Sequence, residues 1–248
     1  MLSMPGRSLL VDIGNSRIKW MLADADGNTQ PESIAHGGRL PPALEKRWQS
    51  IAPPQHVLVS CVAHADIVSA LETLASRLWG SDVRRLVATR EHGGLVNCYD
   101  HPERLGVDRW LAMSGAHAMA EGAFCVVDAG TAMTIDVVGP GGRHQGGLIV
   151  PGLSMMIESL RAGTAMPDYA GKASPALLGC STENAIRLGC LRALGALVDR
   201  VIADSELDSP RLLVTGGDAT RVMPFIDSPC EHVPDLVFLG MRGAMQPK

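Results

Sequence analysis

Short apolar runs alternate with amphipathic segments along the first half of the chain. Apolar runs over residues 8–13 and 17–24 are predicted to be strands, joined by a turn at Gly14-Asn15-Ser16. A further apolar run over 56–62 is typical of a buried strand. Apolar residues recur with helical spacing over 66–79. The other elements expected here are a strand near 32–36, a helix over 41–50 and a strand over 83–88.

The second half repeats this pattern. Three strands are expected over 123–128, 132–138 and 144–150, with a glycine-rich turn between the last two. The remaining elements expected are helices over 107–119, 151–161, 183–204, 219–225 and 235–246, strands over 211–215 and 230–233, and a mobile loop over 163–179. A hairpin followed by alternating strands and helices, present twice, predicts a two-lobed α/β fold with an interlobe cleft. We expect lobes over 1–105 and 106–248, with ligands bound at the cleft.

The amino-acid composition argues against a nucleic-acid-binding or membrane-spanning protein. With 46% hydrophobic and only 4% aromatic residues, the core must be filled by aliphatic side chains and Met. The net charge of −4 and the lack of a long basic run argue against nucleic-acid binding. No apolar stretch reaches the roughly 20 residues of a membrane helix, and no signal peptide is evident, so a cytoplasmic location is expected.

The six cysteines show no C-x-x-C pair, which makes a zinc site improbable. Cys61 and Cys125 lie in apolar runs and are interpreted as small buried hydrophobic residues. We therefore expect no catalytic thiol.

Two loops of the same kind carry the strongest chemical signal. Asp12 and Asp128 each end an apolar strand and are followed by a glycine and a hydroxyl residue, Ser16 or Thr131. Glycine lets backbone amides approach a phosphate, and a carboxylate beside phosphate implies a cation between them. One such loop alone is commonly an ordinary turn, but the same arrangement in both halves indicates a nucleotide and metal site.

A third cluster lies where the two halves join. Gly106-Val107-Asp108-Arg109 begins a helix, and Tyr99 lies shortly before it. The functional interpretation makes Asp108 a general base and Arg109 a clamp for a substrate anion. The structural alternatives are a capped surface pair and a partly buried tyrosine.

Two later glycine motifs leave their interpretation open. The segments 146–152 and 215–219 each connect a strand to a helix. Close approach to a ligand, for the second an adenine or ribose, competes with tight strand–helix packing and with Asp218 as a helix N-cap.

Taken in order, these motifs resemble those of type III pantothenate kinases, of the acetate and sugar kinase/Hsp70/actin superfamily. Residues 12–19 resemble the first phosphate loop D-x-G-N-[ST]-x-x-K, and 106–109 the substrate motif G-x-D-R. Residues 128–134 resemble the second phosphate loop D-x-G-T-A-x-T, and 146–152 and 215–219 the later glycine motifs. The matches cover nearly the whole chain.

The resemblance implies a duplicated ribonuclease H-like (actin-like ATPase) fold and ATP-dependent phosphorylation of pantothenate, the first step toward coenzyme A. It also implies a homodimer, Mg²⁺, and a monovalent cation such as potassium or ammonium. Asp108 would be the proton acceptor and Asp128 the monovalent-cation ligand, with Asp12 a possible Mg²⁺ contact. The implied ATP-binding residues are Asp12, Ile13, Gly14, Asn15, Ser16, Arg17, Ile18, Lys19 and Thr131. The implied pantothenate-binding residues are Tyr99, Gly106, Val107, Asp108, Arg109 and Thr182.

Two departures from the family pattern stand out. Ser16 replaces the commoner Thr and keeps the hydroxyl, whereas Cys180-Ser181 precede Thr182 where a Lys-Asn pair is usual. Competing hypotheses are a same-fold kinase or phosphatase acting on another small molecule, and a non-catalytic regulatory protein.

Overall fold

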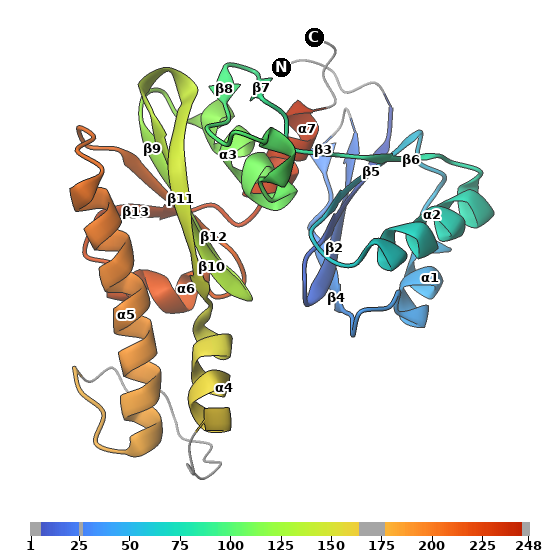
Figure 1. Ribbon diagram of the computed structural model, residues 1–248. Coiled ribbons are helices and arrows are strands. Elements are labelled where there is room, and N and C mark those ends of the chain that lie inside the picture. The colour runs from blue at the N-terminus through green and yellow to red at the C-terminus, as the bar shows by residue number, and fades with distance from the viewer. Residues whose placement is uncertain (1–5, 25–26, 164–176, 245–248) are drawn as a thin grey trace. The chain divides into compact units, whose positions relative to one another are not determined.

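The computed structural model describes residues 6–24, 27–163 and 177–244 (Figure 1). It contains two compact units, each with its own sheet. Unit 1 comprises Met1–Met119 and Asp235–Lys248, and unit 2 comprises Ala120–Pro234. The loop expected over 163–179 falls mostly outside the described residues. Within the described part of the chain, no helix is long and apolar enough to cross a membrane.

The sheet of unit 1 is built around an antiparallel hairpin. Its strand order is β3-β2-β1-β5-β6, with β4 also paired to β2. β1 runs antiparallel to β2 and parallel to β5, and β5 runs parallel to β6. The strands are β1 (Ser8–Ile13), β2 (Arg17–Asp24), β3 (Gly27–Asn28), β4 (Glu32–Ala35), β5 (His56–Cys61) and β6 (Val83–Arg85).

Helices cover both faces of this sheet. Side chains of a strand alternate between faces, so Leu9 and Leu10 of β1 point to opposite sides. Leu9 belongs to a buried cluster with α1 and α2, in which Trp20, Trp48 and neighbouring aliphatic residues pack together. Leu10 belongs to a second cluster with α3 and α7. The helices are α1 (Pro42–Trp48), α2 (Ala65–Trp79), α3 (Val107–Met119) and α7 (Leu236–Gly243).

Close packing of α3 on α7 explains why the units divide differently from the expected lobes at 105 and 106. An added Cβ at Gly115 would collide with the Leu236 carbonyl oxygen, and one at Gly240 with the Leu111 carbonyl oxygen. The two backbones can approach this closely only because both positions are glycine. α3 and the C-terminal α7 therefore belong to unit 1.

The segment between β6 and α3 has secondary structure of its own. It contains a short hairpin of β7 (Glu91–His92) and β8 (Leu95–Val96), followed by the 3₁₀ turn η1 (Pro102–Arg104). The two-residue turn at Gly93-Gly94 has positive φ at both positions, as the tightest hairpins require.

Unit 2 repeats the arrangement of unit 1. Its strands lie in the order β13-β12-β9-β10-β11, with β9 antiparallel to β10 and parallel to β12. They are β9 (Phe124–Ala129), β10 (Ala132–Gly139), β11 (Arg143–Pro151), β12 (Arg211–Thr215) and β13 (Cys230–His232). The turn between β10 and β11 is η2 (Pro140–Gly142).

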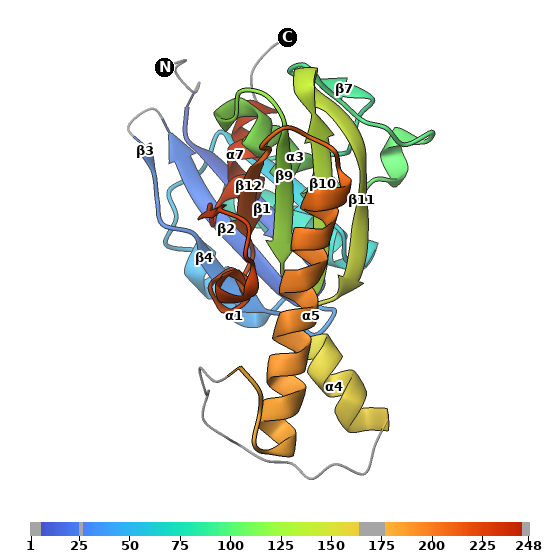
Figure 2. The same ribbon diagram turned by 90° about the vertical axis from the view of Figure 1, so that its left-hand side faces the viewer.

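The long helix α5 (Thr182–Asp204) crosses the sheet of unit 2 (Figure 2). Its buried face, including Leu191, Leu194 and Val198, joins Val127 and Val214 of the sheet in one core. α4 (Leu153–Gly163) precedes α5 in the chain. The expected helix over 219–225 is instead α6 (Ala219–Val222) followed by the 3₁₀ turn η3 (Met223–Phe225). Pro224 explains this change, because proline cannot continue α-helical hydrogen bonding.

The duplication predicted from the two loops is visible in strand register. Asp12 lies opposite Lys19 of β2 and Ser60 of β5. Asp128 lies opposite Thr134 of β10 and Thr215 of β12. Each aspartate thus occupies the same place in the same three-stranded arrangement, as the predicted actin-like fold requires.

Candidate functional site

The first candidate loop is a tight turn held from both sides. The Gly14 amide donates to the Arg17 carbonyl oxygen at 3.0 Å, and a ring nitrogen of His36 lies 2.7 Å from the Gly14 carbonyl oxygen. The His36 amide donates to the Ser16 carbonyl oxygen at 3.0 Å. Asn15, Ser16 and Arg17 are exposed on this braced turn, where their polar groups can meet a ligand.

Asp12 is fixed beneath this turn. It is only 8% exposed, and one carboxylate oxygen accepts a hydrogen bond of 3.0 Å from the Ser60 hydroxyl. Lys19, opposite Asp12 on β2, is half-buried. The flanking Ile13 and Ile18 are fully buried and anchor the turn in the core.

The second candidate loop, in unit 2, is braced by backbone hydrogen bonds. The Gly130 amide donates to the Ala132 carbonyl oxygen at 3.1 Å, and the Gly152 amide to the Thr131 carbonyl oxygen at 3.0 Å. The Thr131 residue is exposed, whereas Asp128 at the end of β9 is half-buried. The loop therefore presents one hydroxyl side chain outward above a recessed carboxylate.

The two later glycine motifs pack against this second loop. An added Cβ at Gly152 would collide with the Gly130 carbonyl oxygen. Gly216 has φ of +95°, and an added Cβ there would collide with Asp128 and with the Ala129 carbonyl oxygen. At these two positions the geometry favours the packing interpretation. By contrast, Gly217 is exposed with open space beside its Cα.

Asp218 does not cap α6 through its side chain. Its carboxylate instead accepts a hydrogen bond of 2.8 Å from Arg221, and its amide donates to the Ala129 carbonyl oxygen at 2.9 Å. The diglycine turn is thus tied to the second loop by backbone contacts, which fixes the position at which α6 begins.

The third cluster gathers in unit 1 as the sequence suggested. Arg109 is only 6% exposed, and its guanidinium donates to the Tyr99 hydroxyl at 3.1 Å. Asp108, in the first turn of α3, accepts a hydrogen bond of 2.8 Å from the Arg109 amide. An added Cβ at Gly106 would lie 2.7 Å from the Asp108 carboxylate, so glycine leaves room for that side chain. Val107 is buried and anchors the start of α3.

Asn97 holds the Tyr99 segment in place. This residue is 1% exposed, and its side-chain amide donates to the carbonyl oxygens of Thr89 and Pro102, each at 3.2 Å. Its side-chain oxygen accepts the Tyr99 amide at 3.0 Å. The buried Asn97 side chain thereby helps to order a loop that has few apolar residues.

Thr182 is the exposed first residue of α5. Ser181 caps this helix by accepting the Asn184 amide at 3.3 Å. Thr182 belongs to unit 2 and Arg109 to unit 1. Its contact with substrate stays a prediction.

Burial disfavours the thiolate form of two cysteines. Burial raises the pKa of the Cys125 thiol to about 12. Burial raises the pKa of the Cys61 thiol as well and outweighs the opposing effect of its hydrogen bond to Ala63, with smaller effects from the Asp12 and Arg85 charges. Both thiols stay protonated at neutral pH. Cys61 is half-buried rather than fully buried as expected.

Two residues that stabilise the first candidate loop, Ser60 and His36, were difficult to identify from the sequence. Ser60 is a lone hydroxyl residue in a buried parallel strand, at the position level with Asp12. Pairing the predicted strands would have indicated it. His36 follows an exposed short strand and gave no comparable signal.

Comparison with known proteins connects these features to a family. The family model for type III pantothenate kinase matches residues 8–204. A type III pantothenate kinase of Alkalilimnicola ehrlichii is 38% identical over 238 residues, covering 94% of this chain and 95% of the relative. A second, of Nitrosococcus oceani, is 36% identical over 243 residues, covering 94% and 91%.

Solved structures agree on the fold. A conserved putative Baf family transcriptional activator from Campylobacter jejuni superposes with a TM-score of 0.59 at 21% identity, covering 94% of this chain and 95% of that one. A putative 2-dehydro-3-deoxygalactonokinase from Sinorhizobium meliloti gives 0.60 at 16% identity, covering 96% and 97%. At such identities the likeness shows the fold alone, which is the actin-like ATPase fold. By its sequence similarity over nearly its full length, this chain belongs to the type III pantothenate kinase family.

Proposed function

We propose that this protein transfers the γ-phosphoryl group of ATP to the primary hydroxyl of pantothenate, the first step of coenzyme A biosynthesis. Family membership supports the reaction. The observation that carries the residue-level proposal is the cluster in which the buried Arg109 guanidinium donates to the Tyr99 hydroxyl and the Arg109 backbone amide donates to the Asp108 carboxylate. It combines a fixed cation, a hydrogen-bonding hydroxyl and a carboxylate, as recognition of a hydroxy acid requires.

In this proposal Arg109 and Tyr99 bind pantothenate. A guanidinium kept from bulk water pairs strongly with a carboxylate, because little hydration competes with the ion pair. Val107 and Gly106 shape the same segment, and Thr182 adds a contact from α5.

Asp108 would act as the general base. Phosphoryl transfer depends on positioning and charge neutralisation more than on covalent chemistry. Asp108 accepts the proton of the substrate hydroxyl. At the same time the hydroxyl oxygen bonds to the γ-phosphorus, and the bond from this phosphorus to the leaving ADP oxygen breaks. Peptide dipoles at the start of α3 stabilise a carboxylate in this first turn.

The loop of residues 12–19 and Thr131 would contact the phosphates of ATP. The exposed Asn15 and Ser16 and the half-buried Lys19 supply polar and positive groups. Among the described residues, no three His, Cys, Asp or Glu side chains gather into a metal-binding group. This fits Mg²⁺ held mainly by phosphate oxygens and water, with Asp12 as a carboxylate contact. When bound, the ion offsets phosphate charge.

Asp128 is proposed as a ligand of a monovalent cation. Its carboxylate is recessed at the end of β9, and Gly216 packs against both this carboxylate and the Ala129 carbonyl oxygen. Carboxylate and carbonyl oxygens form the donor set that hard cations prefer.

We further propose a cytoplasmic homodimer. Exposed large apolar side chains occur on β11 and α4 of unit 2, at Leu148, Ile149, Met155 and Leu160. Exposed apolar side chains that follow one another along the chain are typical of an interaction surface.

A coupled assay of ADP release with purified protein tests the reaction. We expect release that depends on pantothenate and increases with added potassium. ADP release with another hydroxy acid or sugar, but not with pantothenate, would assign a different kinase activity. Phosphate release without an acceptor would indicate a phosphatase, and no turnover at all would favour a non-catalytic role.

A further inference from the structure

His36 connects the first candidate loop to the end of β4. Pairing of β4 with β2 places Ala35 opposite Arg17, and the His36 amide extends this pairing by donating to the Ser16 carbonyl oxygen at 3.0 Å. The ring of His36 also reaches Gly14, whose carbonyl oxygen lies 2.7 Å from Nε2. One half-buried residue therefore holds the loop through both its backbone and its side chain.

The hydrogen-bond partners of His36 decide what each ring nitrogen does. The Gly14 carbonyl oxygen can only accept, so Nε2 must carry a proton and donate to it. The Gly38 amide can only donate, at 3.2 Å, so Nδ1 must present its lone pair. The imidazole is thus held in one tautomer, and its single donor is directed at the loop.

This hydrogen bond sets the direction of the peptide unit between Gly14 and Asn15. No peptide bond of the described residues is cis, and the C=O and N–H groups of a trans peptide point in opposite directions. Because the Gly14 carbonyl oxygen faces His36, the Asn15 amide faces away from it. Asn15 is exposed, and within the described residues its amide donates to no other group. An amide held in this way is available to an anion.

Steric crowding does not fix this peptide unit. An added Cβ at Gly14 would meet only the Arg17 carbonyl oxygen, at 3.6 Å, which is an ordinary contact. A glycine backbone has wide conformational freedom, so the peptide plane after Gly14 has little else to restrain its rotation. The hydrogen bond from His36 therefore restrains the direction of the Asn15 amide.

We propose that His36 is a positioning residue of the first candidate loop. Its Nε2–H holds the Gly14 carbonyl group and thereby aims the Asn15 amide at a phosphate oxygen of ATP. This inference rests on the proposed function, since it presumes that ATP is the phosphoryl donor. An amide that is oriented before binding loses little freedom when the phosphate arrives, so the restraint strengthens phosphate binding. His36 acts through Gly14 and is not itself a catalytic residue.

Two substitutions separate the roles of the two ring nitrogens. Glutamine places an amide N–H near the position of Nε2, so H36Q keeps the bond to Gly14 and loses the one to Gly38. Asparagine places an oxygen near the position of Nδ1, so H36N keeps the bond to Gly38 and loses the one to Gly14. H56N is the matched control, because His56 is exposed and pairs with Ser8 at the opposite end of β1.

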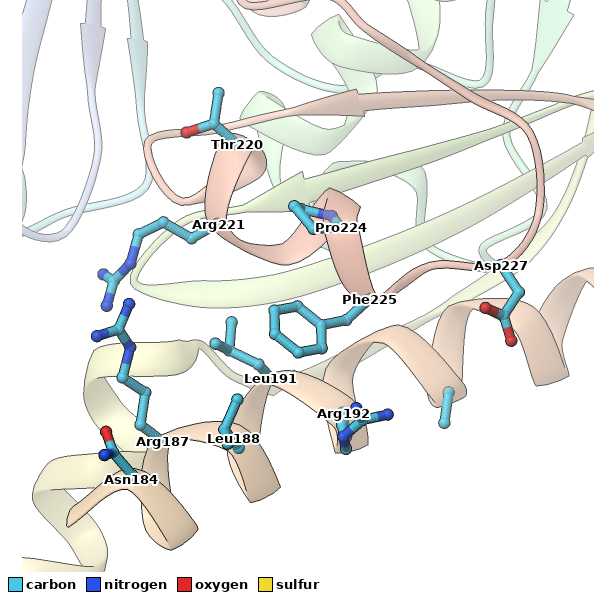
Figure 3. A pocket seen from close by; sticks show the side chains of 11 residues that line it. Asn184, Arg187, Leu188, Leu191, Arg192, Thr220, Arg221, Pro224, Phe225 and Asp227 are labelled. Atoms are coloured by element: carbon cyan, nitrogen blue, oxygen red, sulfur yellow. The ribbon is translucent and has the colours of Figure 1, made fainter. Parts of the chain in front are cut away.

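Binding of ADP, pyrophosphate and adenosine is measured by calorimetry, and the KM values for ATP and pantothenate by ADP release. Unit 2 holds a competing cluster of positive charge, because Arg187, Arg192 and Arg221 line a pocket between α5 and α6 with η3 (Figure 3). Pyrophosphate bound there would not report on the loop. Each affinity is therefore compared between the His36 variants, which leave that pocket unchanged.

We expect H36N to weaken the binding of ADP and of pyrophosphate about tenfold, the effect of one lost hydrogen bond, and to raise the KM for ATP similarly. H36Q and H56N should bind both ligands as the wild type does. Adenosine binding and the KM for pantothenate should be unchanged in every variant, because neither depends on the Asn15 amide.

Three outcomes would overturn the positioning role. Equal losses in H36Q and H36N would show that the donor at Nε2 does not matter. Unchanged pyrophosphate binding in H36N would show that the loop needs no such restraint. A matching loss of adenosine binding in H36N would indicate general damage to the fold instead.

The positioning role and the proposed function fail separately in this experiment. Turnover of pantothenate with normal ADP binding in H36N refutes the positioning role and leaves the kinase function intact. ADP binding that H36N weakens and H36Q preserves, without turnover of pantothenate, refutes the function and supports the positioning role.

Discussion

Single buried polar residues decide the geometry of the candidate site. Arg109 is a charge that the fold keeps almost entirely from solvent, and its guanidinium still has donors beyond the one used on Tyr99. Asn97 is also buried, and its side chain forms hydrogen bonds with three backbone groups of the loop that carries Tyr99. Polar side chains fixed in this way lose little freedom when a substrate binds, which favours specific recognition.

Replacing Asp108 by Asn should separate chemistry from binding. The amide keeps the size and the hydrogen bond from the Arg109 amide but cannot accept the substrate proton. We expect kcat to fall by about 10²–10⁴ while the affinity for ADP is nearly unchanged. Single-turnover kinetics and calorimetry measure these quantities, and near-normal turnover would exclude Asp108 as the base.

Exposed cysteines should be labelled by a thiol reagent faster than buried ones. Cys98 and Cys180 are exposed, whereas Cys125 is buried and its pKa is raised to about 12. Iodoacetamide at neutral pH should modify Cys98 and Cys180 rapidly and Cys125 only after unfolding, because the thiolate is the reactive form. Peptide mass spectrometry of native and denatured protein reads this out. Rapid native labelling of Cys125 would contradict the described core.

At the scale of elements, contacts between helices determine which unit a helix belongs to. The crossing of α3 and α7 depends on Gly115 and Gly240, whose missing side chains let the backbones meet. The same residue type has no such role at Gly189 on α5, where an added Cβ would meet nothing within 4 Å. Local sequence gives no means of telling these glycines apart.

Gly115→Ala and Gly189→Ala therefore make a matched pair. We expect Gly115→Ala to lower the free energy of unfolding by about 1–3 kcal/mol through overpacking. Gly189→Ala should raise it by up to about 1 kcal/mol through helix propensity. Urea denaturation followed by circular dichroism measures both free energies. Equal effects of the two substitutions would contradict the close packing of α3 on α7 at Gly115.

Asp199 connects α5 to the segment after η3. Its carboxylate accepts the amides of Asp227 at 3.0 Å and Ser228 at 2.9 Å. Partial burial alone would raise the pKa of Asp199, but these hydrogen bonds outweigh it and hold the pKa below its ordinary value. A lowered pKa means that the carboxylate stabilises the fold above the unfolded pKa and loses this effect as pH falls through the folded pKa.

Asp199→Asn should thus destabilise unit 2 at neutral pH by about 1 kcal/mol, the usual size of such a hydrogen-bond loss. The difference from the wild type should shrink as pH falls below about 4, where the wild-type carboxylate becomes protonated. Denaturation curves at pH 7 and pH 3 test this. A larger difference in the free energy of unfolding at pH 3 than at pH 7 would contradict a lowered pKa of Asp199.

At the scale of the whole molecule, the two units repeat one topology but present different surfaces. Unit 2 carries exposed Leu148 and Ile149 on β11 and exposed Met155 and Leu160 on α4. Such side chains, set apart from the buried core, are a reason to expect self-association.

We predict that Ile149→Lys yields a monomer, because a charge in an apolar interface lacks a partner and costs several kcal/mol. Val87→Lys is the control, since Val87 of unit 1 is similarly exposed, at 64% against 62% for Ile149. Light scattering after gel filtration should show a dimer for the wild type and for Val87→Lys. A wild-type monomer would refute the dimer, and a dimeric Ile149→Lys would place the interface elsewhere.

The sequence by itself determined the features that depend on short-range pattern. Apolar strands ending at Asp12 and Asp128, the turns after them and the G-x-D-R segment were predictable, because strand periodicity and glycine turns are local properties. The repeated order of these elements also determined the duplicated fold. Helix ends shifted by a few residues, and Pro224 changed the end of the predicted helix after β12.

Tertiary structure alone decided which distant residues meet. Ser60 reaches Asp12 from 48 residues away, because parallel pairing of β1 and β5 aligns their ends. The assignment of α7 to unit 1 follows from its glycine contact with α3. Such contacts depend on how helices and strands pack, a long-range property that no local spacing of residues encodes.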